Sequence, residues 1–290
     1  MHPLAHHPFL KMNGIGNAIL VVDLRNTDYV LTPDDARAIA QEPDTPFDQL
    51  MVLYPPRRPE TAAFMKIFNC DGSLSAACGN GTRCVAWALT EQSGHTSLLL
   101  ESDAGLLACT KNDAWHFSVD MGTPRLDWQQ IPLSFAVADT DQVSIKLDPT
   151  FDIDLPVASA VNMGNPHAVF FVPDAASIAL ETIGPALEHH PAFPEKANIS
   201  MAQMLGRSEM ILRVWERGAG LTLACGSGAC AAGVAAIRRG LAERKILVHL
   251  PGGDLSIEWR AQDGHVVMSG LVELEARMAF DPSLFGNGAA

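Results

Sequence analysis

The sequence lacks the features that would mark a membrane or exported protein. Within its 290 residues, no apolar run approaches the roughly 20 residues that a membrane-spanning helix needs. The start of the chain also lacks the basic and apolar regions of an export signal. It carries three histidines instead, and we expect a frayed terminus there rather than a metal site. These absences favour a cytoplasmic protein.

Basic residues are scarce. Lysine and arginine total 20 against 33 acidic residues, which gives a net charge of −13. A surface for nucleic acid needs the opposite balance, so we expect no nucleic-acid partner. Apolar residues make up 48% of the chain, enough for a globular protein. The length suits two domains of ordinary size.

Cysteines are also few, at six. Without an export signal, this number does not suggest a disulfide framework. The spacings Cys78 to Cys84 and Cys225 to Cys230 lack the close C-x2-C pairing of a zinc site. There is no C-x-x-C redox motif and no glycine-rich loop for phosphate, so we expect no metal and no cofactor. We expect the other four thiols (Cys70, Cys84, Cys109 and Cys230) to be buried in the core.

What the chain does contain is one motif written twice. Residues 77–81, Ala-Cys-Gly-Asn-Gly, return at 224–228 as Ala-Cys-Gly-Ser-Gly, at an offset of 225 − 78 = 147. At or near the same offset, residues 66–69 match 213–216, the Gly-Asn pair at 16–17 matches 164–165, and 120–122 matches 268–270. Several matches in one order indicate duplication of a whole domain. Two such copies usually pack about a pseudo-twofold axis, which would bring equivalent residues face to face.

Hydrophobic periodicity and turn residues predict the elements of each half. Helices are expected at 33–41 with Thr32 as N-cap, at 80–92, at 177–188 and at 226–240. Strands are expected at 19–23, 50–54, 64–69, 97–101, 106–110, 115–121, 168–171, 209–216, 245–250, 254–259, 265–269 and 272–280. The stretch from Thr123 to Asp154 has no counterpart in the other half and is expected to hold the linker.

Each motif places a cysteine directly before a helix. Unpaired N–H groups and the partial positive charge at a helix start favour thiolate over thiol. Glycines at the first and third following positions allow a sharp turn and close approach of a ligand. The same N–H groups can hold a carboxylate and stabilise a carbanion beside it. Two such thiols on opposite sides of one carbon could remove a proton from one face and return one to the other.

Simpler interpretations stay open for single residues. Cys-Gly-x-Gly could merely cap a helix, although two copies at a fixed offset weaken that explanation. Asn17, Asn165 and Asn198 could be turn residues. His167 could be a partly buried structural imidazole.

Taken together, these motifs make the chain resemble the diaminopimelate epimerase family over essentially its whole length. The most specific stretches are Phe68 to Ser73, Ala77 to Gly81, Met163 to His167, and Trp215 to Gly220 running into Ala224 to Gly228. The resemblance implies an α/β (α+β) fold of two pseudo-symmetric domains, each a mostly antiparallel sheet wrapped around a central helix, with the site between them. We place the domains at 1–125, joined by the C-terminal strand 272–290, and at 126–271.

The resemblance also implies the activity, which is cofactor-independent epimerisation of LL- to meso-diaminopimelate for lysine and peptidoglycan precursors. Cys225 would take the α-proton and Cys78 would donate one, with the roles exchanged in reverse. His167 and Glu216 match positions that adjust the pKa of the two thiols. The remaining implied substrate contacts are Asn17, Gln49, Asn69, Gly79, Asn80, Asn165, Asn198, Glu216, Arg217, Gly226 and Ser227. Arg217 could grip a carboxylate bidentately, and Glu216 could meet an ammonium group. The family also suggests a homodimer.

Two departures from the family pattern concern the expected mouth of the cleft. Ala18 stands where an acidic residue is more common, and the loop Asp44 to Phe47 lacks a glycine-rich lead-in. Racemases of proline, hydroxyproline or histidine use the same paired cysteines, but Arg217, Asn69 and Asn198 favour a substrate with a polar distal end. A protein of another class, in which the two cysteines sense redox state by forming a disulfide, is the remaining alternative.

Overall fold

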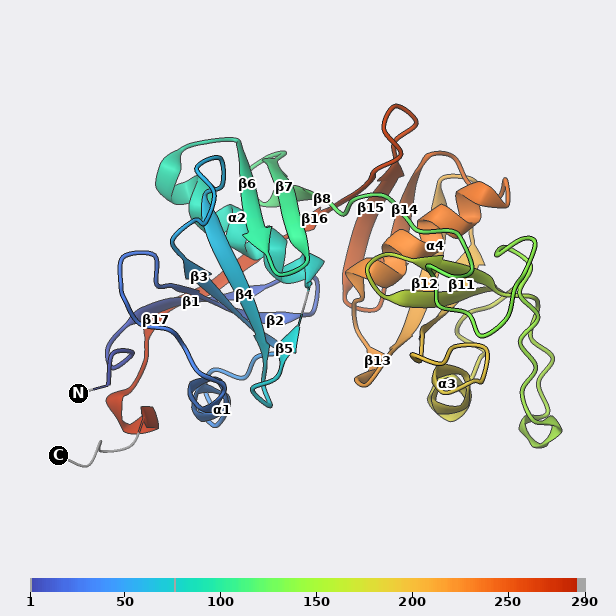
Figure 1. Ribbon diagram of the computed structural model, residues 1–290, viewed down its shortest axis with the longest axis horizontal. Coiled ribbons are helices and arrows are strands. Elements are labelled where there is room, and N and C mark those ends of the chain that lie inside the picture. The colour runs from blue at the N-terminus through green and yellow to red at the C-terminus, as the bar shows by residue number, and fades with distance from the viewer. Residues whose placement is uncertain (1, 76, 286–290) are drawn as a thin grey trace. The chain divides into compact units, whose positions relative to one another are not determined.

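The computed structural model describes residues 2–75 and 77–285 (Figure 1). The chain divides into two compact units. The first unit runs to Val119 and resumes at Gly270, and the second runs from Asp120 to Ser269. Each unit combines one long sheet with one enclosed helix and one outer helix.

The sheet of the first unit is mostly antiparallel. Its strands are β1 (Pro8–Asn13), β2 (Ala18–Asp23), β3 (Gln49–Tyr54), β4 (Ala63–Asn69), β5 (Leu74–Ser75), β6 (Ser97–Ser102), β7 (Gly105–Lys111), β8 (His116–Asp120) and β17 (Glu273–Ala279). Strand β17 pairs with β1, and the order continues through β2, β3, β4, β6, β7 and β8. The β2–β3 and β4–β6 pairs are parallel. Strand β5 pairs with the end of β4 that β6 leaves uncovered.

The second unit repeats this pairing scheme. Its strands are β9 (Ser159–Asn162), β10 (Pro166–Phe171), β11 (Asn198–Met204), β12 (Glu209–Glu216), β13 (Gly220–Thr222), β14 (Lys245–Leu250), β15 (Gly253–Trp259) and β16 (Val266–Leu271). Strands β10–β11 and β12–β14 are parallel, as β2–β3 and β4–β6 are in the first unit. The intervening β11–β12 pair and the following β14–β15 pair are antiparallel, as in the first unit. The duplication predicted from the sequence is therefore also a duplication of topology.

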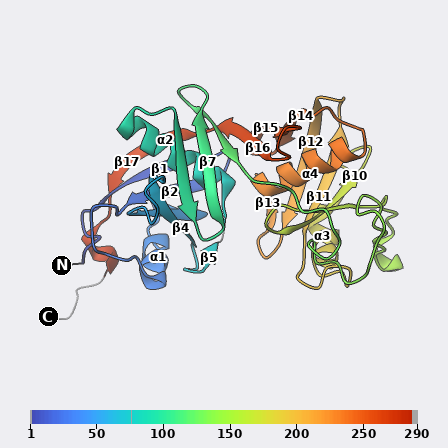
Figure 2. The same ribbon diagram turned by 45° about the horizontal axis from the view of Figure 1, so that its top comes forward.

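The helix that follows each cysteine motif is enclosed by the sheet of its own unit (Figures 1 and 2). Helix α2 (Gly79–Ser93) packs against β2, β3, β6 and β7, and its residues from Asn80 to Thr90 are all buried. Helix α4 (Gly226–Arg238) packs against β9 to β12, β14 and β15. Small residues permit this enclosure, because a Cβ at Gly233 would lie 2.9 Å from Cγ2 of Ile257. The predicted central helices are confirmed.

The two outer helices close the second side of each sheet. Helix α1 (Pro33–Ala40) begins with a capping box, in which Thr32 and Asp35 bond to each other's backbone N–H. Helix α3 (Leu180–Glu188) packs on β11, β12 and β13. It begins three residues later than predicted, because Asp174 and Ser177 form local turns ahead of it. Two short 3-10 helices, at Pro149–Phe151 and Pro282–Phe285, complete the described elements.

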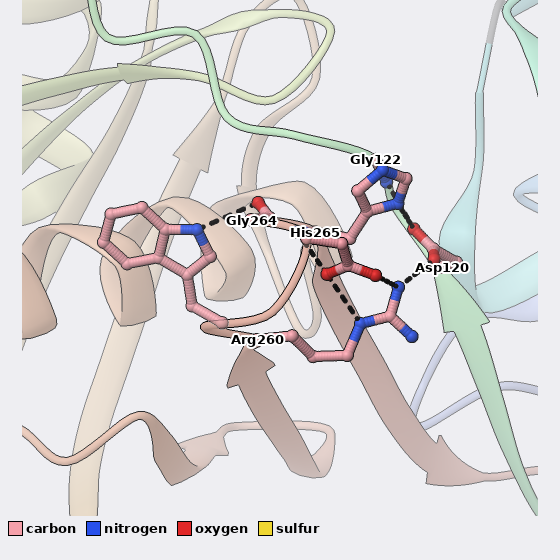
Figure 3. Close-up of polar contacts among 7 residues, drawn as sticks. Asp120, Gly122, Arg260, Gly264 and His265 are labelled. Carbon is pink, nitrogen blue, oxygen red and sulfur yellow. Dashed lines mark hydrogen bonds and ion pairs between the residues drawn. The ribbon is translucent and has the colours of Figure 1, made fainter.

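A polar cluster fixes the start of the second unit to its β15–β16 turn (Figure 3). Asp120 accepts hydrogen bonds at its two carboxylate oxygens, from Nδ1 of His265 at 2.7 Å and from Arg260 at 2.6 Å. Arg260 also pairs with Asp263 at 2.8 Å, and the N–H of Val266 donates to the carbonyl of Gly122. The turn is thus tied to the segment by which the chain enters this unit.

Other sequence predictions differ from the structure. Strands β1, β5, β9, β11 and β13 were not predicted, although β1 and β11 each pair with a strand on both sides. The N-terminus is not frayed at His2, whose ring stacks on Phe285 and lies 3.2 Å from Oδ1 of Asp35. Cys70 is exposed rather than buried, whereas Cys84, Cys109 and Cys230 are buried as expected. In residues 2–75 and 77–285, no helix is long and apolar enough to cross a membrane.

Candidate active site

Cys78 is the N-cap of α2, as its motif predicts. Its sulfur accepts a hydrogen bond from the N–H of Gly81 at 3.2 Å, and its thiol donates to Oε1 of Gln49 at 3.4 Å. Gln49 begins β3 and stands opposite Asn69 in the antiparallel register with β4. A Cβ at Gly81 would lie 2.5 Å from the sulfur of Met51, so only glycine fits there without displacing Met51. The first thiol is therefore held by a tight backbone turn and faces an amide.

The turn before β2 lies directly on the start of α2. Asn17 accepts at its Oδ1 a hydrogen bond of 3.1 Å from the side-chain amide of Asn80. A Cβ at Gly14 would lie 3.2 Å from Cβ of Asn80, which shows how closely the turn approaches the helix. Gly16 has a φ of 87°, in the left-handed region that favours glycine. The Gly-Asn motif thus delivers Asn17 to the residue that follows the Cys78-Gly79 pair.

Cys225 is the N-cap of α4 and is more deeply enclosed than Cys78. Its sulfur accepts from the N–H of Gly228 at 3.4 Å and lies 3.6 Å from the hydroxyl of Ser227. A Cβ at Gly228 would lie 3.2 Å from this sulfur. Only 3% of Cys225 is exposed, which removes the thiol from bulk water. Both cysteines therefore occupy the helix starts that the sequence predicts for them.

The electrostatics at Cys225 differ from the sequence expectation. Burial raises the pKa of the Cys225 thiol well above its usual range, and the nearby carboxylate of Glu216 raises it further. Bonds from Ser227 and the N–H of Gly228 lower this pKa but do not offset burial. The prediction that the helix start makes this thiol acidic is therefore wrong. Glu216 is itself held by the hydroxyl of Thr222, at 2.6 Å.

His167 lies on β10 and is completely buried. Its Nε2 is 2.8 Å from Oδ1 of Asn165, whose amide nitrogen in turn lies 3.4 Å from the hydroxyl of Ser227. Burial, with the charge of Arg217 as a smaller cause, lowers the pKa of His167 to about 3. The ring is therefore neutral at physiological pH. It reaches Cys225 through two intervening side chains, Asn165 and Ser227.

Asn198 and Arg217, in the second unit, are joined by a hydrogen bond. Asn198 is 2% exposed, donates to the carbonyl of Pro166 at 3.0 Å and accepts from the backbone N–H of Arg217 at 3.0 Å. The guanidinium of Arg217 donates to the carbonyl of Glu195 at 2.9 Å. Asn69 similarly donates to the hydroxyl of Ser73 at 2.9 Å. These polar residues already have partners in the protein, so any substrate contact would be made with their remaining atoms.

The predicted residues fall into two groups, one in each unit. Asn17, Gln49, Asn69, Cys78, Gly79 and Asn80 gather around the start of α2, and Asn165, His167, Asn198, Glu216, Arg217, Cys225, Gly226 and Ser227 gather around the start of α4. The strand register shows which residues of the two groups are equivalent. In the parallel β2–β3 pair Gln49 stands opposite Ile19, and in the corresponding β10–β11 pair Asn198 stands opposite His167. An isoleucine in one half thus occupies the place of the histidine in the other.

Sequence reasoning missed two residues that hold others in place. Asp48 accepts from the amide of Asn17 at 2.8 Å, and Thr222 donates to Glu216. Asp48 directly precedes Gln49, and Thr222 lies 147 positions after Ser75 in the repeat, since 222 − 75 = 147. Those positions were visible in the sequence, but the side-chain directions were not.

A sequence model of the family described as diaminopimelate epimerase matches residues 9–126 and 159–275. Among proteins similar to this chain is a diaminopimelate epimerase from Methylocella silvestris, 53% identical over 290 residues and covering 100% of both sequences. Another, from Methylobacterium sp. strain 4-46, is 54% identical over 297 residues and also covers 100% of both.

Solved structures share the fold at low identity. A predicted epimerase from Pseudomonas aeruginosa has a TM-score of 0.68 at 18% identity, covering 94% of this chain and 99% of that one. A probable proline racemase from Agrobacterium radiobacter K84 has a TM-score of 0.68 at 14% identity, covering 96% and 94%. These likenesses establish the fold alone. The family match and the relatives with more than half of their residues identical establish that the chain belongs to the diaminopimelate epimerase family.

Proposed function

We propose that this chain interconverts LL- and meso-2,6-diaminopimelate by a two-base reaction, with Cys78 and Cys225 as the acid–base pair. The observation that carries the proposal is that each cysteine caps a helix and receives a backbone N–H on its sulfur, in two units of like topology. In the LL-to-meso direction, Cys225 thiolate takes the α-proton and Cys78 thiol delivers a proton to the opposite face. The reverse direction exchanges these roles.

The N–H groups at the two helix starts support the negative charge that builds on the substrate carboxylate as the α-proton leaves. Gly79 and Gly226 follow the cysteines directly, and a residue without a side chain allows a ligand to approach the backbone closely. The two thiols supply both proton transfers, so the reaction requires no pyridoxal phosphate, flavin or metal.

Because the pKa of Cys225 is raised, its thiol must lose a proton to a neighbouring group before it can act as the base. Burial and the carboxylate of Glu216 hold the pKa of this thiol well above its usual range, and Glu216 is the neighbouring group that can take its proton. A sulfur that holds its proton tightly is also a stronger base once deprotonated, as removal of a weakly acidic α-proton requires. Glu216 therefore acts on Cys225, and neutral His167 acts on the same sulfur through Asn165 and Ser227.

The polar side chains in the two groups suit a substrate with an ammonium and a carboxylate at each end. Asn and Gln side chains both donate and accept hydrogen bonds. Arg217 provides the cation for the distal carboxylate. We further propose that the domains span 1–125 with 272–290 and 126–271, and that the enzyme is a cytoplasmic homodimer. Family membership and the acidic composition support these assignments.

Deuterium exchange tests the mechanism and the substrate together. LL-diaminopimelate incubated with the enzyme in deuterated water should gain label at the α-carbon of the meso product. Cys78→Ala and Cys225→Ala should each abolish epimerisation, whereas Cys70→Ala, which removes an exposed thiol, should retain it. Full activity in either of the first two variants would rule out the two-base scheme. Exchange with proline but not with diaminopimelate would assign a different substrate.

A further inference from the structure

Three side chains near the start of α2, those of Asn80, Asn17 and Asp48, are linked by hydrogen bonds. Asn80 donates its amide to Oδ1 of Asn17, and Asn17 donates its own amide to Oδ2 of Asp48 at 2.8 Å. Asn80 is 2% exposed, and its Oδ1 has no hydrogen-bond partner within residues 2–75 and 77–285. A buried oxygen without a partner costs free energy unless a ligand supplies the donor. This oxygen therefore points to a bound group that donates.

Asp48 determines which way these amides face. A carboxylate only accepts hydrogen bonds, so Asn17 must turn its amide nitrogen toward Asp48 and its oxygen toward Asn80. Asn80 must then donate, which leaves its own oxygen as the open acceptor. Asp48 is fixed in turn, because the same Oδ2 accepts from the N–H of Ala18 at 2.9 Å and the N–H of Asp48 donates to the carbonyl of Ala18 at 2.8 Å.

In the second unit, the asparagine equivalent to Asn17 has its side-chain amide oriented the other way around. Asn165, the counterpart of Asn17, turns its oxygen to His167 and its amide nitrogen to Ser227. The position before Asn198, which corresponds to Asp48, is Ala197, whose methyl group cannot accept a hydrogen bond. The same amide thus presents an oxygen to the helix start in one half and a nitrogen in the other. The carboxylate of Asp48 accounts for the difference.

We propose that Asp48 is a positioning residue that holds Asn17 so that Oδ1 of Asn80 stays open to accept from an ammonium group of the substrate. The inference rests on the proposed function, whose substrate carries an ammonium beside each carboxylate. The backbone N–H groups at the start of α2 hold the carboxylate, and Oδ1 of Asn80 receives the neighbouring ammonium. Asp48 therefore acts on substrate binding and not on proton transfer.

Steady-state kinetics of four variants test this role. Asp48→Ala and Asn17→Ala should each raise KM about tenfold, as expected for loss of one charge-assisted hydrogen bond, with kcat within about twofold of the parent. The KM of the double variant should not exceed the higher KM of the two single variants, because both changes disturb the same chain of hydrogen bonds. Asp48→Asn should restore KM, since one oxygen makes both bonds and the N–H of Ala18 keeps that oxygen in place.

Asp34→Ala, which removes an exposed carboxylate of the same unit, serves as the matched control and should leave KM unchanged. Melting temperatures of all variants separate lost folding from lost binding. Parental KM in Asp48→Ala, full additivity with Asn17→Ala, or a fall in kcat at unchanged KM would each overturn the assignment. If the parent enzyme itself does not epimerise diaminopimelate, the proposed function fails instead, so the two failures are distinguishable.

Discussion

The hydroxyl of Thr222 donates a hydrogen bond of 2.6 Å to Oε1 of Glu216, across the hairpin that β12 and β13 form ahead of Cys225. Glu216 is the carboxylate that receives the Cys225 thiol, so its orientation determines where the proton of that thiol can go. We therefore expect Thr222, three residues before the cysteine, to influence the Cys225 thiol through Glu216.

Removing this hydroxyl should slow catalysis. Thr222→Val keeps the shape of the side chain but removes the hydroxyl that donates to Oε1 of Glu216. A hydrogen bond to a charged group contributes about 1.5–3 kcal/mol, so kcat should fall about tenfold or more. Thr222→Ser keeps the hydroxyl and should stay within a few-fold of the parent. Equal activity in the valine and serine variants would show that Thr222 does not position Glu216.

The reactivity of Cys225 should report its environment directly. Because burial and Glu216 raise the pKa of this thiol well above its usual range, its alkylation by iodoacetamide should be slow at pH 8 and still rising at pH 10. Glu216→Gln removes the negative charge, lowers the pKa of Cys225 and should speed alkylation at pH 8 several-fold. Peptide-level mass spectrometry separates Cys225 from the exposed Cys70. A plateau below pH 8 in the parent enzyme would contradict this account.

The sequence predicted the frame of the site well because its signals are local. Thr32 and Pro33 predicted the start of α1, and the glycines after each cysteine predicted the starts of α2 and α4. The alternating pattern of β12 gave its bounds without error. Each of these predictions uses residues that are neighbours along the chain, where capping and periodicity act.

Features that depend on distant partners were missed. Strand β11, from Asn198 to Met204, has a single β-branched residue, Ile199, and is specified by pairing with β10 and β12. His2 is ordered by Tyr29, Asp35 and Phe285, which the sequence does not place beside it. The raised pKa of Cys225 likewise follows from burial by the surrounding sheet, which outweighs the helix start that the sequence reveals.

His167 should make the protein sensitive to acid. Its pKa is lowered to about 3 in the folded state against about 6.5 unfolded, so its contribution is complete above pH 6.5 and is lost as pH falls toward 3. Between pH 6.5 and 4.5 the loss amounts to roughly 2–3 kcal/mol of unfolding free energy. Urea unfolding should show a shallower pH dependence in His167→Gln than in the parent. His95→Gln, at an exposed position, should keep the parental slope.

Two buried thiols should have the opposite effect at alkaline pH. Burial raises the pKa of Cys84 and of Cys109 to about 12, against about 8.5 in the unfolded chain. Their contribution is complete below pH 8.5 and is lost as pH rises toward 12, at about 1.4 kcal/mol per pH unit for each thiol. The Cys84→Ala/Cys109→Ala variant is expected to unfold at lower urea but with a smaller decline from pH 8 to 10. An identical decline in both proteins would show that these thiols ionise without unfolding.

The close contact between Gly81 and Met51 should make the start of α2 intolerant of a single methyl group. Alanine at position 81 would bring Cβ within 2.5 Å of the Met51 sulfur, and Met51 is completely buried, so the side chain has little room to move. Gly81→Ala should cost about 1–3 kcal/mol of unfolding free energy and lower activity, because the N–H of Gly81 holds the Cys78 sulfur. Met51→Ala opens the space, so the double variant should be less destabilised than the two single costs added together.

Gly206→Ala adds a methyl group where no atom lies within 4 Å and should change neither stability nor activity. Simple additivity of the two changes would mean that α2 shifts away from β3 rather than pressing on Met51.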